Sequence, residues 1–194
     1  MKTNWPERVW VNSPVRLLIQ GREARFFQDL QDLPGGGVCL EIGCGRGAAV
    51  KLISGRFRPR RIDVLDLDPA MVRLVSRRKG AAGGVTMQAD AQALPYRGGS
   101  FDAVFNFGIL HHLEDWKRGL AEVSRVLREG GRFYFEEIYT PLYANPLFRR
   151  LLAHPRENRF RGPEFRGALS DVGLRLLPGF IETRFFILGV AIRA

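Results

Sequence analysis

The sequence is poor in cysteine and in long apolar runs. Its two cysteines, Cys39 and Cys44, stand five residues apart, a spacing that suits neither a disulfide framework nor a metal centre. No run approaches the ~20 apolar residues that span a bilayer, and the first ten residues lack the apolar segment of a secretory signal. These absences predict a cytoplasmic protein with reduced thiols and no bound metal.

Lysine is also scarce, so arginine carries most of the net charge of +10. A basic balance is typical of proteins that bind nucleic acid or anionic membranes. The arginines are scattered, with modest clusters at 56–61, 73–79 and 149–166, and no aromatic-interleaved basic stripe occurs. The pattern favours an arginine-rich solvated surface over nucleic-acid binding, and it leaves transient contact with an anionic membrane open.

No internal repeat or long linker interrupts the chain, and apolar runs alternate with helical patterns. We expect parallel strands at 38–42, 62–66, 85–88, 103–107 and 132–138. The runs 174–181 and 184–192 are joined too closely to be parallel, so they predict an antiparallel hairpin. Together they predict a Rossmann-like α/β fold with a seven-stranded, mostly parallel sheet, one antiparallel strand and helices on both faces.

The helices carry clear end signals. Ser13-Pro14 and Asp68-Pro69 each place a capping side chain before a first-turn proline, and Pro163 opens another helix that ends at Gly173. A helix from Trp116 is expected to stop at Gly130. The apolar face of the first helix is expected to comprise Val15, Leu18, Ile19, Phe26, Leu30 and Leu33.

A single domain accounts for all 194 residues. Its parts are an N-terminal helical cap at 1–33, a core at 36–138, an irregular segment at 140–162, and a closing helix and hairpin at 163–194. The segment 140–162 is rich in Pro, Arg and aromatic residues and has no clear period.

The glycine-rich turn Gly43-Cys44-Gly45-Arg46-Gly47 leaves the first strand and enters a helix. Ligands of open α/β sheets bind at that edge. The chain has no phosphate loop of the G-x-x-x-x-G-K-[ST] type, and Glu41 before the turn would repel a phosphate and attract an ammonium group. Asp66 and Asp90 follow the next two strands, where they suit a ribose diol and an adenine amine. The three carboxylates predict a ligand with those groups and no phosphate.

The sequence resembles the class I S-adenosylmethionine-dependent methyltransferases, in the group of small bacterial enzymes called type 11. The resemblance is carried by VCLEIGCGRG, VLDLDPAMV, QADAQALPYRGGSFDAVFNFGILHHLED and AEVSRVLREGGRFYFEE, in that order, across 36–138. It implies that S-adenosylmethionine is the cofactor, that 36–138 is the core that binds it, and that 140–162 is a lid over the acceptor site. The glycines and Cys44 would then wrap its methionyl part, with Glu41 buttressing the turn.

The resemblance also assigns roles further along the chain. Leu67 and Met71 would pack near the adenine, the Ala91 backbone N–H would meet a ring nitrogen, and a backbone carbonyl of Asn106 or Phe107 would meet the methionyl ammonium. Arg46 could pair with the cofactor carboxylate or point to solvent.

The acceptor side is less sharply drawn, because methyl transfer needs a base only when the acceptor must lose a proton. His111, His112, Glu137 and His154 are the candidate catalytic residues; for His111 and His112 a packing or capping role is the alternative. Asn106-Phe107-Gly108-Ile109 departs from the Asn/Asp-Pro-Pro-Tyr pattern of amine- and amide-methylating relatives. That leaves an oxygen, carbon, sulfur or small amine as acceptor.

An anionic, partly apolar small molecule, such as a lipid or quinone precursor, is the expected acceptor. Three alternatives stay open at this point: an RNA or DNA methyltransferase that uses the basic surface, a catalytically silent methyltransferase fold that serves binding, and a nicotinamide-dependent oxidoreductase with the same first turn.

Overall fold

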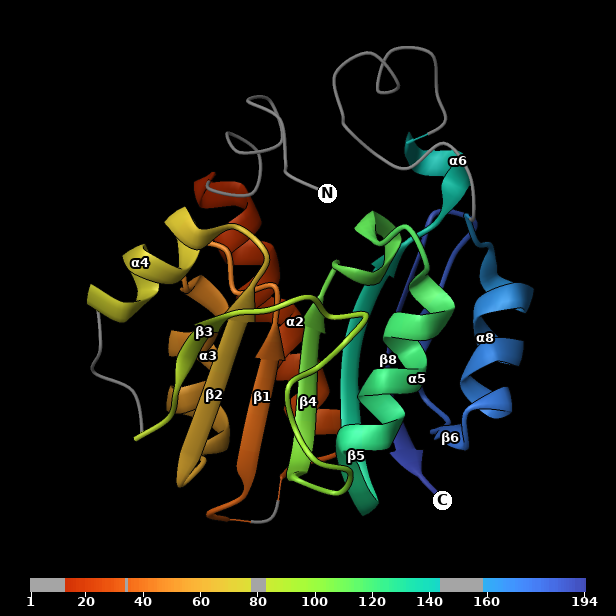
Figure 1. Cartoon of the computed structure of the whole chain (residues 1–194). Coiled ribbons are helices and arrows are strands. Elements are labelled where there is room, and N and C mark those ends of the chain that lie inside the picture. The colour runs from red at the N-terminus through yellow and green to blue at the C-terminus, as the bar shows by residue number, and fades with distance from the viewer. Residues whose placement is uncertain (1–12, 34, 78–82, 144–158) are drawn as a thin grey trace.

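An eight-stranded sheet lies at the centre of the protein. The structure is a computed structural model that describes residues 13–33, 35–77, 83–143 and 159–194. The sheet order is β3-β2-β1-β4-β5-β8-β6, and β7 also pairs with β8 (Figure 1). The strands are β1 (Val38–Ile42), β2 (Arg61–Asp66), β3 (Thr86–Gln88), β4 (Phe101–Phe107), β5 (Leu127–Ile138), β6 (Leu174–Leu176), β7 (Ile181–Glu182) and β8 (Phe186–Arg193).

Strand directions confirm the predicted fold class. The five strands β1 to β5 pair in parallel, while β8 runs antiparallel to β5 and to both β6 and β7. The predicted first strand of the hairpin is divided into β6 and β7 around Pro178-Gly179, and Gly179 has a φ of 90°. Because β6 and β7 share one edge of β8, the eight strands occupy seven positions across the sheet.

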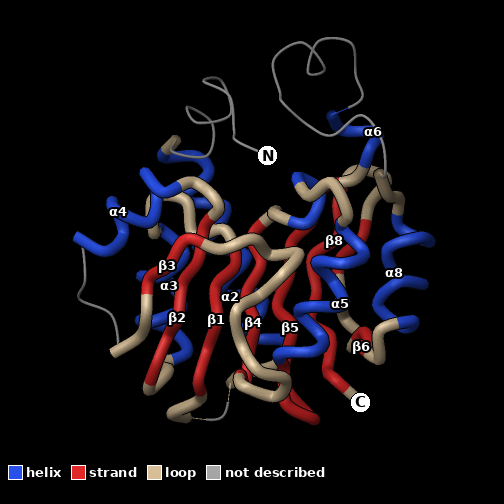
Figure 2. The backbone as a smooth tube through the Cα atoms, in the orientation of Figure 1, coloured by secondary structure: helices blue, strands red, loops and turns tan. Residues whose placement is uncertain are grey.

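Helices cover both faces of the sheet. The helices α5 (Trp116–Val126) and α8 (Gly162–Asp171) lie in front of it in Figures 1 and 2, and α2 (Pro14–Leu30) and α3 (Ala48–Phe57) lie behind it. Each layer buries its own apolar cluster. The rear layer also takes Val75 from α4 (Pro69–Arg77). The short elements η1 (Leu110–His112) and α6 (Thr140–Tyr143) follow β4 and β5.

The start signals of the helices are confirmed. The Ser13 hydroxyl accepts from the Arg16 backbone N–H at 3.1 Å, and the Asp68 carboxylate accepts from the Ala70 N–H at 2.8 Å. The predicted end of α5 is wrong. That helix stops at Val126, because Leu127 is already extended and pairs with Phe101, so Gly130 takes its φ of 70° inside β5.

The predicted apolar face of α2 is wrong in the first turns of the helix, whereas the predicted Phe26, Leu30 and Leu33 do belong to the rear apolar layer. Val15 and Leu18 are 55% and 60% exposed. The face that is buried against the sheet is instead made by Arg16, Gln20, Glu23, Ala24 and Phe27. Three of these five residues are polar or charged, because the first turns of α2 lie over the edge of the sheet where β5 ends and Arg16 bonds to Glu136. Side-chain hydrophobicity therefore predicted the wrong buried side for the first turns of α2, although the helix lies at the predicted place in the chain.

Both cysteines are buried free thiols, as their spacing predicted. Of the helices in the four described ranges, none is long and apolar enough to cross a membrane. Residues 144–158, which hold most of the predicted lid and His154, lie outside the described residues.

An aromatic group fixes the rear layer to the sheet. Phe105 stacks on Tyr134 at 4.6 Å between ring centroids and meets Phe57 edge-on at 5.0 Å. We expect Phe105→Ala to lower the free energy of unfolding by about 3–5 kcal/mol, because it leaves a cavity in a packed core. Urea denaturation measures the change. Val15→Ala on the exposed side of α2 is the control, and an equal loss there would contradict this assignment of the core.

Candidate active site at the carboxyl edge of the sheet

The glycine turn after β1 is held in a left-handed path. Gly43, Gly45 and Gly47 have φ values of 69°, 48° and 79°, which disfavour any residue with a Cβ. The Cys44 N–H donates to the Leu65 carbonyl at 3.0 Å, so the turn is attached to the end of β2. Helix α3 then begins at Ala48, with Gly47 as its N-cap.

Two of these glycines are also needed for space. A Cβ on Gly43 would stand 2.3 Å from Cδ1 of Ile109, and one on Gly47 would stand 3.0 Å from Val75. A Cβ on Gly45 would meet nothing within 4 Å. The turn therefore packs tightly against the loop after β4 and leaves room at its tip, where a ligand backbone could approach.

Asp66 closes β2 and organises the tip of the turn. Its Oδ2 accepts from the Gly45 N–H at 2.9 Å and its Oδ1 accepts from the Asp68 N–H at 2.8 Å. Burial raises the pKa of Asp66, and the two backbone hydrogen bonds oppose that rise. Each carboxylate oxygen keeps a further lone pair, so a diol could still bind. Leu67 is exposed next to it, and Met71 is half-buried on α4.

Asp90 follows β3 by two residues, at the same edge of the sheet. Both of its oxygens accept from the Gln92 side chain, at 3.1 and 3.2 Å. Gln92 in turn accepts from the Asp115 N–H at 2.8 Å, which joins this loop to the start of α5. Ala91 is buried between them. The carboxylates predicted to meet the ribose and the adenine thus lie on neighbouring strand ends.

Glu41 is a buried carboxylate with an unused oxygen. The residue is 2% exposed in the middle of the sheet, and within the described ranges no donor reaches its Oε2. Burial raises its pKa well above the usual value, and the nearby Asp66 raises it further. A buried acceptor without a donor costs about 1–3 kcal/mol. Its place two residues before Gly43 indicates a ligand that brings a donor or a positive charge.

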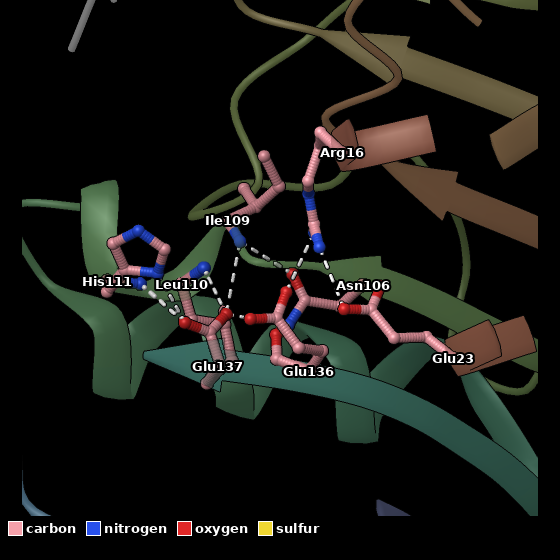
Figure 3. Close-up of polar contacts among 8 residues, drawn as sticks. All are labelled: Arg16, Glu23, Asn106, Ile109, Leu110, His111, Glu136 and Glu137. Atoms are coloured by element: carbon pink, nitrogen blue, oxygen red, sulfur yellow. Dashed lines mark hydrogen bonds and ion pairs between the residues drawn. The ribbon is translucent and has the colours of Figure 1, made fainter. Parts of the chain in front are cut away.

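Glu137 is the centre of a buried polar cluster where β4 and β5 end (Figure 3). It is fully buried, and its Oε1 accepts from the Asn106 side chain at 2.7 Å and from the backbone N–H groups of Ile109 and Leu110 at 3.1 and 2.7 Å. Its Oε2 meets Nδ1 of His111 at 2.6 Å and accepts from the His111 N–H. Burial raises the pKa of Glu137 to about 7.

The two histidines after β4 lie side by side, with ring centroids 4.3 Å apart. Burial, with a smaller contribution from Arg16, lowers the pKa of His111 to about 3, so the ring is neutral and points Nδ1–H at Glu137. His112 is half-buried. The structure therefore brings His111, Glu137 and Asn106 together, while Phe107 packs on Phe27 at 5.7 Å on the other face of the sheet.

A second buried network on that rear face was not predicted. Arg16 donates to Glu23 at 2.8 Å and to Glu136 at 2.9 Å, so it bridges α2 and the end of β5 (Figure 3). Burial raises the pKa of Glu23 to about 7, and burial raises the pKa of Glu136 as well. The sequence held one signal for it, since Arg16 and Glu23 stand seven residues apart on the face that also carries Phe27.

These residues fit a nucleoside cofactor with an ammonium group. The open tip at Gly45 and the orphaned oxygen of Glu41 suit its amino-acid end, and Asp66 and Asp90 suit its sugar and base. A glycine turn and acidic strand ends at the carboxyl edge of an open α/β sheet are typical of enzymes that bind a nucleoside cofactor.

Comparison with known proteins agrees with this class. Residues 40–135 match the model of the methyltransferase domain, and this stretch belongs to that family, in its type 11 group. The family and the fold indicate S-adenosylmethionine as the cofactor. A SAM-dependent methyltransferase from Aquifex aeolicus has the same fold, with a TM-score of 0.72 at 17% identity over 97% of this chain and 98% of that one.

Two curated relatives act on lipids. A fatty-acid O-methyltransferase from Mycolicibacterium smegmatis is 39% identical over 114 residues, which are 59% of this chain and 41% of that protein. A phthiotriol/phenolphthiotriol dimycocerosates methyltransferase from Mycobacterium leprae is 35% identical over 99 residues, 51% of this chain and 37% of that protein. The matched segment thus spans about two fifths of the length of these relatives.

Glu41 lowers the stability of the ligand-free folded protein as the pH rises above the acidic range. Its folded pKa lies above the unfolded one, so the folded state loses stability as pH rises from about 4.5 towards the folded pKa. We expect Glu41→Gln to stabilise the ligand-free protein by about 1 kcal/mol at pH 8 and to change little at pH 4. Urea denaturation at both pH values measures this, and a variant that is less stable at pH 8 would contradict it.

Proposed function

We propose that this protein transfers the methyl group of S-adenosylmethionine to a small lipid-like acceptor. The observation that carries the proposal is the orphaned, buried oxygen of Glu41 next to a glycine turn with an open tip. An ammonium group satisfies a buried carboxylate far better than a phosphate could. The match to the methyltransferase domain supports the same cofactor.

The cofactor would be held by residues from four strand ends. Gly43, Cys44, Gly45 and Gly47 would surround its amino-acid end, with Glu41 and a backbone carbonyl of Asn106 or Phe107 near the ammonium. Asp66 would accept from the ribose hydroxyls, with Leu67 and Met71 beside the adenine, and Asp90 and the Ala91 N–H would meet the base. When bound, S-adenosylmethionine supplies an electrophilic methyl group with a good leaving group, so the protein's main task is positioning.

Among the candidate catalytic residues, we propose that Glu137 and His111 order the loop rather than take a proton. Both oxygens of Glu137 are occupied by backbone and side-chain donors, and His111 is a buried neutral ring that donates to it. His112 stands beside that ring, and we propose that it lines the acceptor side. His154 lies outside the described residues and keeps its place as a predicted acceptor-side residue.

The lipid-like acceptor is supported by the two curated relatives, whose names specify fatty acids and phthiotriol lipids. The first turns of α2 add a physical reason, since Val15, Leu17 and Leu18 are all exposed there. Apolar side chains on a protein of net charge +10 suit transient contact with an anionic membrane that holds such an acceptor.

Asp66 provides the test of the cofactor site. We expect Asp66→Asn to weaken the binding of S-adenosylhomocysteine by about 100-fold, because two charge-assisted hydrogen bonds to the ribose are lost. Isothermal titration calorimetry measures the affinity. Asp171→Asn, at an exposed carboxylate at the end of α8, is the matched control and should bind as the wild type does. Unchanged binding by Asp66→Asn would remove the proposed ribose contact, and a wild-type protein that binds no S-adenosylhomocysteine would remove the proposed function.

The membrane contact has its own test. We expect the wild-type protein to sediment with phosphatidylglycerol vesicles at low salt, and Leu18→Glu to reduce the bound fraction severalfold, because the change adds charge to the exposed apolar turn. Phosphatidylcholine vesicles are the control for charge. Equal sedimentation of the variant and the wild type would contradict a role for this turn.

A further inference from the structure

Glu136 lies near the carboxyl end of β5, at the level of the glycine turn. It is paired with Phe107 in the register of β4 and β5, and Asn106, one residue earlier on β4, is paired with Ile42 of β1. One step further along β1 is Gly43, so Glu136 lies level with the first glycine of the turn. Side chains alternate along a strand, so Glu136 and Glu41 both face the rear layer and α2, whereas Glu137 faces η1.

The neighbouring residues Glu136 and Glu137 differ in whether a carboxylate oxygen is left without a hydrogen bond. The Oε2 of Glu136 accepts from Arg16 at 2.9 Å, but among the described residues no hydrogen bond reaches its Oε1, and its side chain keeps 10% exposure. Glu137 is 0% exposed, with both oxygens bonded. Of this pair, Glu136 alone offers an oxygen to an arriving molecule.

The surroundings of Glu136 are acidic. From α2 it faces Arg16 and, through that guanidinium, Glu23; from its own strand Glu137 adds negative charge; and from η1 comes His111. Gly108 lies between the two residues, since a Cβ added to it would stand 3.1 Å from Oε2 of Glu136 and 3.3 Å from Cε1 of His111. The Arg16 guanidinium is shared by Glu23 and Glu136, and the His111 imidazole is neutral.

We propose that Glu136 is the proton acceptor of the reaction and that the acceptor molecule is a neutral hydroxyl rather than a carboxylate. The proposal rests on the proposed function. Arg16 holds Oε2 in place and keeps the carboxylate from turning away, while Oε1 faces the acceptor. A carboxylate acceptor would have to enter next to Glu136 while the Arg16 guanidinium is already engaged, which like charges oppose.

The chemical step balances without a further reagent. The acceptor oxygen forms a bond to the methyl carbon while the bond from that carbon to sulfur breaks, and its electron pair leaves with the sulfur. The hydroxyl proton passes to Oε1 of Glu136 and then to solvent through the exposed side of the residue. Glu136 is therefore a catalytic residue, and Arg16 is a positioning residue that acts through it.

Binding of two matched probes tests the charge preference without turnover. The protein is loaded with S-adenosylhomocysteine, and 1-decanol and decanoate are titrated at pH 8 by calorimetry. We expect the wild type to bind 1-decanol at least about tenfold more tightly, a difference of about 1.4 kcal/mol, and Glu136→Gln to narrow that ratio below about threefold. Tighter binding of decanoate, binding of neither probe, or an unchanged ratio in the variant overturns the proposal.

Turnover gives the second readout. We expect Glu136→Gln to slow methylation of 1-decanol by about 10²- to 10⁴-fold, the usual contribution of a general base. In the wild type kcat/KM rises with pH as Glu136 loses its proton, and this rise is absent in the variant. A variant that keeps the wild-type rate and pH profile contradicts the assignment.

The controls separate this proposal from the proposed function. Glu136→Gln should bind S-adenosylhomocysteine as the wild type does. If the wild-type protein binds no S-adenosylhomocysteine, the proposed function fails, and this result says nothing about Glu136. Glu129→Gln, at an exposed carboxylate near the start of β5, should match the wild type throughout. If Glu136→Gln does not fold, Glu136→Asp keeps the charge but withdraws it by one methylene. It should retain the preference for 1-decanol and lose most of the rate.

Discussion

The buried carboxylate of Glu137 is the contact on which the acceptor side depends. It accepts hydrogen bonds from three consecutive backbone N–H groups, those of Ile109, Leu110 and His111, and so fixes the turn that follows β4. Without that carboxylate the buried Leu110 N–H would lose its acceptor, at about 1–3 kcal/mol, whereas the Ile109 N–H would keep Oδ1 of Asn106 at 3.0 Å. The position of Ile109 against Gly43 follows from this turn, and with it the width of the gap between the cofactor turn and the acceptor side.

The buried carboxylates of the site lower the stability of the folded protein. Glu41, Glu23, Glu136 and Glu137 all have raised pKa values because burial disfavours their charged forms. A stable empty fold would carry apolar residues at such positions. Within the described residues Glu41 and Glu23 each keep a buried oxygen without a donor, whereas both oxygens of Glu137 are bonded. The two buried oxygens without donors lower the stability of the ligand-free protein.

The sheet and the cofactor side could be predicted from the sequence because their signals are local. Apolar runs that alternate with helical patterns indicate β1 to β5. The ends of these strands are followed closely in the sequence by Gly43, Gly45, Asp66 and Asp90. The face of α2 could not be predicted in this way. Arg16 and Glu23 are buried only because Glu136, 120 residues further along than Arg16, meets them in the folded protein. Gly130 was misplaced for a similar reason, since pairing of Leu127 with Phe101 ended α5 before the glycine was reached.

The bridge from Arg16 to Glu136 has a consequence for how the protein folds. It closes a loop of 120 residues that contains β1 to β4 and most of β5, so it is among the contacts that form late. Until it forms, the Glu136 carboxylate lacks the Arg16 guanidinium, whereas Glu23 lies on the same helix as Arg16 and can pair with it locally. The glycine turn needs only β1 and β2, because the Cys44 N–H donates to the Leu65 carbonyl. The ion pair between Arg16 and Glu136 therefore reports the closure of the whole loop, which the glycine turn does not.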